Sequence, residues 1–81
     1  MTLNEEVISF LEGFFSQREG VEALEMIRKV DLVDEGYLDS LDILSLAAQL
    51  EISFGVKLDF SDSQTFSGMR QFDTIVKLIG K

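Results

Sequence analysis

The sequence predicts an all-α fold, a small bundle of three main helices plus one or two short helices. Apolar residues recur at helical spacing in three long segments, and no two segments alternate between apolar and polar residues as paired strands would. The chain has 81 residues with 46% hydrophobic side chains, which suffices for one small core but not for two. We therefore expect a single domain that spans residues 1–81.

The first main helix is expected over residues 3–16. When each residue is turned by about 100°, the apolar side chains of this segment fall within one broad arc. Polar side chains occupy the opposite side, and Thr2 can cap the N-terminus. Glu5 and Glu6 lie in the first turn, where negative charge suits the helix dipole. The segment is therefore predicted to form an amphipathic helix.

Residues 17–39 carry a weaker pattern. A short helix over residues 21–29 is possible, because Val21, Leu24 and Ile27 recur at helical spacing. The rest of the segment mixes apolar residues with turn formers, so we expect a loop that runs along the body of the protein. Its anchors in the core are expected among Leu32, Val33 and Leu38.

The second main helix is expected over residues 40–54. Asp39 or Ser40 can cap its N-terminus, and Gly55 supplies a stop. This helix carries apolar residues on two nearly opposite sides. One side consists of Ile43, Leu46, Ala47, Leu50 and Phe54, and the other consists of Leu41, Leu44, Ala48 and Ile52.

Only one of these two apolar sides can face the core of so small a domain. The second side then has two possible explanations. The short helix over residues 21–29 could cover it, or it could stay exposed and bind a partner protein. The sequence leaves both explanations open.

The C-terminal part is expected to contain a short helix over residues 62–67 and the third main helix over residues 68–80. Ser61 and Gln64 have the spacing of a capping box that would open the short helix. Apolar residues of the third main helix align on one face, namely Met69, Phe72, Ile75, Val76 and Ile79. Across the three main helices, the side chains expected in the core include Phe14, Leu46, Leu50, Phe54 and Ile75.

The composition excludes several classes of function. Cysteine and histidine are absent, which removes disulfides, thiolate metal sites, the usual zinc ligand and the usual general base. A formal charge of −8 repels nucleic acid and favours protein partners with basic patches, unless it serves solubility alone. No segment is long and apolar enough to span a membrane, and the acidic N-terminus is unlike a secretion signal. We expect a cytoplasmic protein that acts as a monomer.

A calcium-binding loop that begins at Asp31 is a poor match. Gly36 and Asp39 fall at suitable positions, yet Val33 stands where a ligand is needed. Asp42 is too short for the final chelating position. No acid–base pair emerges elsewhere, so we expect neither a metal site nor catalytic residues, and the protein is not expected to be an enzyme.

One serine lies at a position of interest. Residues 35–44 read EGYLDSLDIL and place Ser40 where an acidic loop gives way to an expected helix. Ser40 is not a self-activated nucleophile, because the chain offers neither a histidine nor a serine-x-x-lysine arrangement to serve as its base. A serine at a helix start is commonly an N-cap, but the unpaired amides and the dipole there also suit a phosphate ester.

The chain resembles the acyl carrier protein family, which includes peptidyl and D-alanyl carriers. The resemblance rests on the stretch LVDEGYLDSLDILSLAAQLEISFGV, on DSL opening a helix near the middle of an acidic chain, and on FGVKL after that helix. It covers nearly the whole chain and implies the family's helical bundle. It also implies that a separate transferase esterifies Ser40 with 4′-phosphopantetheine. Acyl groups would then be carried as thioesters on the thiol of this arm, as in fatty acid biosynthesis.

The resemblance further implies that the second main helix is a docking surface. The implied partners are a phosphopantetheinyl transferase, an acyl- or aminoacyl-loading ligase, and downstream synthase or transferase enzymes. Acids are normally numerous on this helix in the family, whereas the helix here offers few, so docking is expected to depend more on its apolar side chains. The expected partner-binding residues are Asp39, Leu41, Asp42, Leu44, Ala48, Glu51 and Ile52.

Two alternatives to an acyl carrier stay open. The DEGYLDS approach to the serine is closer to D-alanyl and other stand-alone aminoacyl carriers, so an aminoacyl, peptidyl or other specialised cargo fits as well. An unmodified helical domain that binds a partner helix through Leu41, Leu44, Ala48 and Ile52 would use the same apolar side without any role for Ser40.

Overall fold

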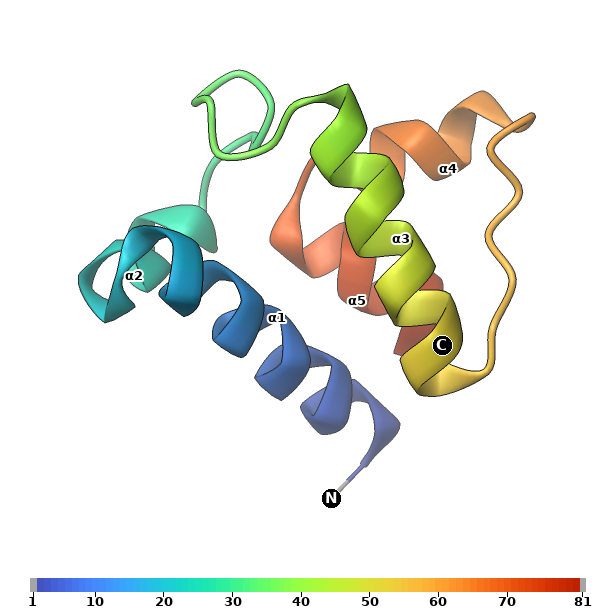
Figure 1. Cartoon of the computed structure of the whole chain (residues 1–81), viewed down its shortest axis with the longest axis horizontal. Helices are drawn as coiled ribbons and strands as arrows, with labels where there is room; N and C mark the ends of the chain where they lie inside the picture. Colours follow the sequence, from blue (N-terminus) through green and yellow to red (C-terminus); the bar gives the residue numbers. More distant parts are fainter. Residues whose placement is uncertain (1, 81) are drawn as a thin grey trace.

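The computed structural model describes residues 2–80 and confirms the all-α prediction, since no residue in this range forms a strand (Figure 1). Three longer helices are α1 (Leu3–Glu19), α3 (Ser40–Phe54) and α5 (Phe72–Gly80). Shorter helices are the 3₁₀ turn η1 (Val21–Ala23), α2 (Leu24–Ile27) and α4 (Ser63–Gly68). No helix within the described range has a stretch long and apolar enough to traverse a membrane.

Helix α1 begins as expected and ends later than expected. The Thr2 hydroxyl accepts from the N–H of Glu5 at 3.1 Å, and the Glu5 carboxylate accepts from the N–H of Thr2 at 2.9 Å, which makes a complete capping box. The helix continues three residues beyond the predicted end. It stops at Gly20, whose φ of 89° favours glycine and whose N–H donates to the Ser16 carbonyl.

The predicted helix over residues 21–29 is shorter and broken. Residues 21–23 form a 3₁₀ turn, and the α-helical turn that follows ends at Ile27. Ile27 is fully buried, and this region packs against α1. Farther along, Leu32 and Leu38 are buried as expected, whereas Val33 is only partly buried.

Helix α3 has the predicted bounds. Asp39, not Ser40, is its N-cap, and Gly55 ends it in the left-handed conformation with a φ of 66°. The side with Ile43, Leu46, Ala47 and Leu50 is buried, as predicted. Figure 1 shows α3 running across the front of the molecule, from the long loop at its start to the connector that leads to α4.

The C-terminal boundaries differ from the prediction. Helix α4 begins at Ser63 with Asp62 as its N-cap, so the expected capping box between Ser61 and Gln64 does not form. Helix α5 starts at Phe72, four residues later than expected. Gly68 is instead the last residue of α4, and the N–H groups of Met69 and Arg70 donate back to the carbonyls of Phe66 and Ser67, so these residues close α4 and do not begin α5.

A single apolar cluster unites the helices. The expected core residues Leu46, Leu50 and Ile75 are fully buried, but Phe14 and Phe54 are only partly buried at its edge. The fully buried aromatic of α1 is instead the next residue, Phe15. The cluster consists of Val7, Leu11, Phe15, Ile27, Leu32, Leu38, Ile43, Leu46, Ala47, Leu50, Met69, Phe72, Ile75, Val76 and Ile79.

Candidate functional site

Ser40 is the first residue of α3 and its side chain is exposed. The capping function lies with its neighbour, because the Asp39 carboxylate accepts from the N–H of Asp42 at 2.8 Å. The Asp42 carboxylate accepts in return from the N–H of Asp39 at 3.1 Å and completes the capping box. The serine hydroxyl is therefore not needed to hold the helix start together.

The exposed position of Ser40 is chemically suited to a phosphate ester. The first N–H groups of an α-helix have no acceptor within the helix, and the dipole is positive at this end. Asp39 uses its carboxylate on the Asp42 amide, two residues beyond Ser40. A phosphate ester on the Ser40 oxygen would lie at the positive end of α3 while remaining in reach of solvent.

Asp42 has an internal role that the sequence did not reveal. Its Oδ2 atom accepts from the Arg18 Nη2 atom of α1 at 3.1 Å, in addition to the Asp39 amide. These hydrogen bonds, the one from Arg18 foremost, hold the pKa of Asp42 below its usual value. Arg18 also lies over the ring of Phe14 at 5.2 Å. The carboxylate expected to meet partner proteins thus ties α3 to α1.

Glu51 has a similar internal role at the other end of α3. Its Oε2 atom accepts from the N–H of Leu58 at 2.7 Å, which fastens the connector after the helix to its last turns. Residues 40–54 contain no acids besides this one and Asp42. The exposed face of α3 is therefore nearly free of uncommitted negative charge.

The second apolar side of α3 is exposed. Leu41 is 76% exposed, Leu44 is 50% exposed and Ile52 is 85% exposed, and Ala48 between them is exposed as well. The possibility that residues 21–29 cover this side is therefore wrong, since that region packs against α1 instead. Apolar side chains that stay in water in a small protein mark a surface available to a partner.

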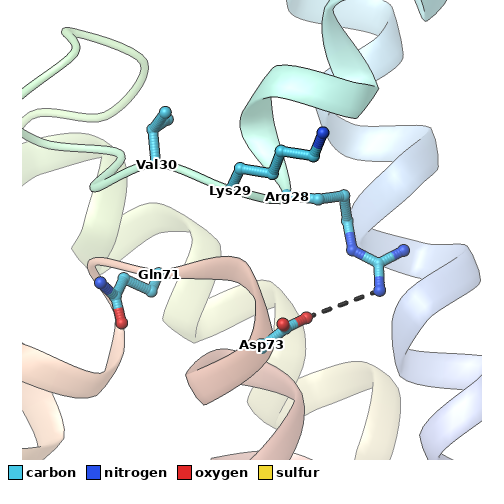
Figure 2. A pocket seen from close by; sticks show the side chains of 5 residues that line it. All are labelled: Arg28, Lys29, Val30, Gln71 and Asp73. Atoms are coloured by element: carbon cyan, nitrogen blue, oxygen red, sulfur yellow. Dashed lines mark hydrogen bonds and ion pairs between the residues drawn. The ribbon is translucent and has the colours of Figure 1, made fainter.

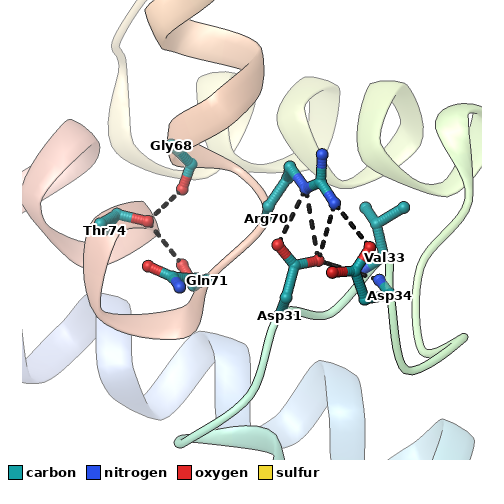
Figure 3. Close-up of polar contacts among 7 residues, drawn as sticks. All are labelled: Asp31, Val33, Asp34, Gly68, Arg70, Gln71 and Thr74. Carbon is teal, nitrogen blue, oxygen red and sulfur yellow. Dashed lines mark hydrogen bonds and ion pairs between the residues drawn. The ribbon is translucent and has the colours of Figure 1, made fainter.

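The loop before Ser40 is fastened to the turn between α4 and α5 (Figure 3). The Arg70 guanidinium contacts Asp31 through Nε at 3.0 Å and Asp34 through Nη2 at 2.8 Å. The pKa of Asp31 lies below its usual value because the N–H of Asp34 and the Arg70 guanidinium both stabilise its carboxylate.

Sequence reasoning missed both Arg18 and Arg70. Arg18 lies 24 positions before its partner, and Arg70 lies 39 and 36 positions after its two partners. Local motifs and helical periodicity contain no signal for pairs this far apart. Only the folding of the chain brings these side chains together.

Two surface hollows lie away from α3. One of about 160 Å³ is polar and is lined by Arg28, Lys29, Val30, Gln71 and Asp73 (Figure 2). Another is lined by residues of the η1 and α2 region, and neither includes a residue of α3. Within residues 2–80, no three acidic side chains lie close enough together to hold a metal ion.

Comparison with known proteins identifies relatives that match most of this chain. An acyl carrier protein of Thermotoga maritima is 33% identical over 67 residues, which are 83% of this chain and 83% of that protein. A meromycolate extension acyl carrier protein of Mycolicibacterium smegmatis is 31% identical over 77 residues, which are 95% of this chain and 75% of that protein. No family model matches the chain, and no solved structure matches it significantly.

Proposed function

Because the chain belongs to the acyl carrier protein family, we propose that it carries acyl groups as thioesters on a 4′-phosphopantetheine arm attached to Ser40. The observation that carries this proposal is the exposure of Ser40 at the first position of α3, next to an aspartate that already caps the helix. Ser40 is thus free to be modified without loss of the capping box.

The arm supplies the chemistry that the chain lacks. The protein contains no cysteine, so the thiol that forms the thioester comes from the arm. It contains no histidine, so the base that activates the Ser40 hydroxyl comes from the phosphopantetheinyl transferase. The protein is a carrier and a substrate of other enzymes, and a flexible arm raises the local concentration of the cargo at each of them.

We propose that these enzymes dock on the exposed apolar side of α3, which consists of Leu41, Leu44, Ala48 and Ile52. Asp39 lies beside the modified serine and meets the transferase directly. Asp42 and Glu51 support docking indirectly, because their carboxylates hold the two ends of α3 in place. The docking partners are the transferase, a loading ligase and the downstream synthase or transferase enzymes.

A second candidate cargo is an aminoacyl group. The observation that favours it is the internal use of both α3 acids, which leaves the docking face less acidic than is usual in carriers of fatty acid biosynthesis. A carrier whose docking depends on apolar contacts suits a specialised pathway with its own dedicated enzymes. Loading of the modified protein by an acyl-activating or an amino-acid-activating ligase distinguishes the two cargoes.

Intact-mass measurement tests the attachment. The purified protein is incubated with coenzyme A and a transferase of broad specificity, beside the variants Ser40→Ala and Ser53→Ala. Ser53 is a matched control, since it is also an exposed serine of α3 but lies at the other end of the helix. We expect one adduct on the wild type and on Ser53→Ala, and none on Ser40→Ala. An unmodified wild type, or an adduct that persists in Ser40→Ala, would refute the proposal.

A further inference from the structure

Arg70 connects the turn between α4 and α5 to the loop that precedes Ser40. Its Nη2 atom donates to Oδ1 of Asp31 at 3.2 Å and to Oδ1 of Asp34 at 2.8 Å, and its Nε atom lies 3.3 Å from Oδ1 and 3.0 Å from Oδ2 of Asp31. Figure 3 shows the guanidinium facing both carboxylates at once. Arginine suits this place because its planar fork can serve two carboxylates in fixed directions.

The backbone of the loop is fastened at the same point. The N–H of Leu32 donates to the Arg70 carbonyl at 2.6 Å. The Leu32 carbonyl then accepts from the N–H groups of Tyr37 at 2.8 Å and Leu38 at 3.0 Å. Leu38 is buried and directly precedes Asp39 and Ser40, so a short chain of hydrogen bonds runs from the Arg70 backbone to the residue before the N-cap of α3.

The turn that contains Arg70 is itself held by hydrogen bonds. Its N–H donates to the Ser67 carbonyl at 3.2 Å. The Thr74 hydroxyl lies within hydrogen-bond distance of the carbonyls of Gly68 and Gln71, on either side of Arg70 (Figure 3). The turn that presents the guanidinium is thus held from both flanks.

The geometry points to Arg70 as a positioning residue for the modification of Ser40, an inference that rests on the proposed function. A transferase has to bind the approach to Ser40, and a loop that is already fixed needs less ordering at that moment. Arg70 does not touch the reacting atoms. Its loss therefore weakens binding of the carrier to the transferase and leaves the chemical step unchanged, which raises KM and not kcat.

The test measures transferase kinetics on the wild type, Arg70→Gln and Arg28→Gln, with coenzyme A saturating and the carrier varied. Arg28 is a matched control, because it too pairs with two carboxylates, Glu12 and Asp73, but on α1 and α5. Both variants change the net charge equally. We expect Arg70→Gln to raise KM about fivefold, in line with the loss of a partly exposed charged pair. Its kcat should stay within twofold, and Arg28→Gln should match the wild type in both constants.

Hydrogen exchange gives an independent readout that does not involve the transferase. We expect the amides of Tyr37 and Leu38 to exchange faster in Arg70→Gln, whereas amides in the middle of α3 keep the wild-type rate. If Arg70→Gln does not fold, Arg70→Lys replaces it, since lysine keeps the charge but cannot fork between two carboxylates. Faster exchange at these two amides and a raised KM are then expected as well.

The outcomes separate this inference from the proposed function. A wild type that takes up no phosphopantetheine overturns both. A wild type that is modified, together with Arg70 variants whose KM equals that of Arg28→Gln and whose Tyr37 and Leu38 amides exchange at the wild-type rate, overturns the role of Arg70 alone. A lowered kcat at unchanged KM overturns it too, since positioning of the loop acts on binding.

Discussion

The two apolar sides of α3 are alike in composition and opposite in environment. Ile43, Leu46 and Leu50 are fully buried, whereas Leu41 and Ile52 are more than three-quarters exposed. Apart from Phe54, both sides consist of aliphatic residues from the same 15-residue helix. Burial of the first side explains why the helix packs where it does, because removal of apolar area from water drives folding. Packing within the protein does not explain why the second side is also apolar.

This contrast teaches that hydrophobicity alone does not assign a residue to the core. A leucine that packs against other helices stabilises the fold, whereas a leucine left in water contributes little to it. The exposed side of α3 adjoins Ser40, the proposed attachment site, so we assign it to partner binding. Substitutions on the two sides should therefore affect different measurements.

The largest effect is expected on the buried side. Leu50→Ala removes a fully buried side chain from the middle of the core and should lower the free energy of unfolding by about 2–5 kcal/mol. Urea denaturation followed by circular dichroism measures it. A variant with the urea midpoint of the wild type would contradict the assignment of this side of α3 to the core.

A substitution on the exposed side should act on binding and spare the fold. We expect Leu44→Asp to lower kcat/KM of the transferase by about tenfold, because a charged carboxylate replaces an apolar side chain at the proposed docking surface. Its free energy of unfolding should change by less than about 1 kcal/mol, because Leu44 is half-exposed. Ser53→Asp adds the same charge to α3 outside the exposed apolar side and serves as the control. Equal kcat/KM values for the two variants would indicate that the added charge, and not the loss of an apolar side chain, weakens docking.

The start of α3 should show an intermediate effect on stability. Asp39→Ala removes the N-cap and with it the hydrogen bond to the Asp42 amide. Loss of an N-cap of this type costs about 1 kcal/mol, within a range of roughly 0.5–2 kcal/mol. The measurement is again the urea midpoint. If Ser40→Ala costs as much as Asp39→Ala, the serine shares the capping role and is less free for modification than we infer.

The smallest effect concerns the acid titration of Asp42. Its pKa is lower in the folded chain than the usual value of 3.8, mainly because of the Arg18 guanidinium. A carboxyl with a lowered pKa stabilises the fold fully above its unfolded pKa, and this contribution is lost as the pH falls through the folded pKa. The difference in unfolding free energy between the wild type and Asp42→Asn should therefore stay constant from about pH 7 to about pH 5 and shrink below 3.8.

Comparing the wild type with Asp42→Asn at each pH removes the effect of the net charge on the unfolding free energy, because the two proteins carry nearly the same charge. Urea denaturation at a series of pH values provides the data. A difference that persists unchanged to about pH 2 would mean that Arg18 and the Asp39 amide do not act on this carboxylate in solution.

Helix α3 could be predicted from the sequence because its determinants are local. Asp39 and Gly55 mark its ends within one residue of the helix, and the 3.6-residue period reveals both apolar sides. The contact made by the turn before α5 could not be predicted, because the Arg70 carbonyl in that turn accepts from the N–H of Leu32. A partner nearly forty positions away leaves no trace in a local pattern.

The candidate site divides in the same way. Ser40 and the exposed side of α3 follow from a short motif and a helical period. The internal roles of Asp42 and Glu51 do not, since a carboxylate on a helix surface gives no indication of which distant donor reaches it. Periodicity predicts Phe14 and Phe54 in the core, but both lie at the edge of the apolar cluster and are only partly buried, while Phe15 is the fully buried aromatic side chain of α1.

Titration of thiols tests the attachment at Ser40 most directly, because the unmodified chain contains no cysteine and hence no thiol. The protein is treated with coenzyme A and the transferase, freed of small molecules by gel filtration, and reacted with Ellman's reagent. We expect one thiol per chain for the wild type and none for Ser40→Ala. A wild type without a thiol, or a Ser40→Ala protein that carries one, would contradict it.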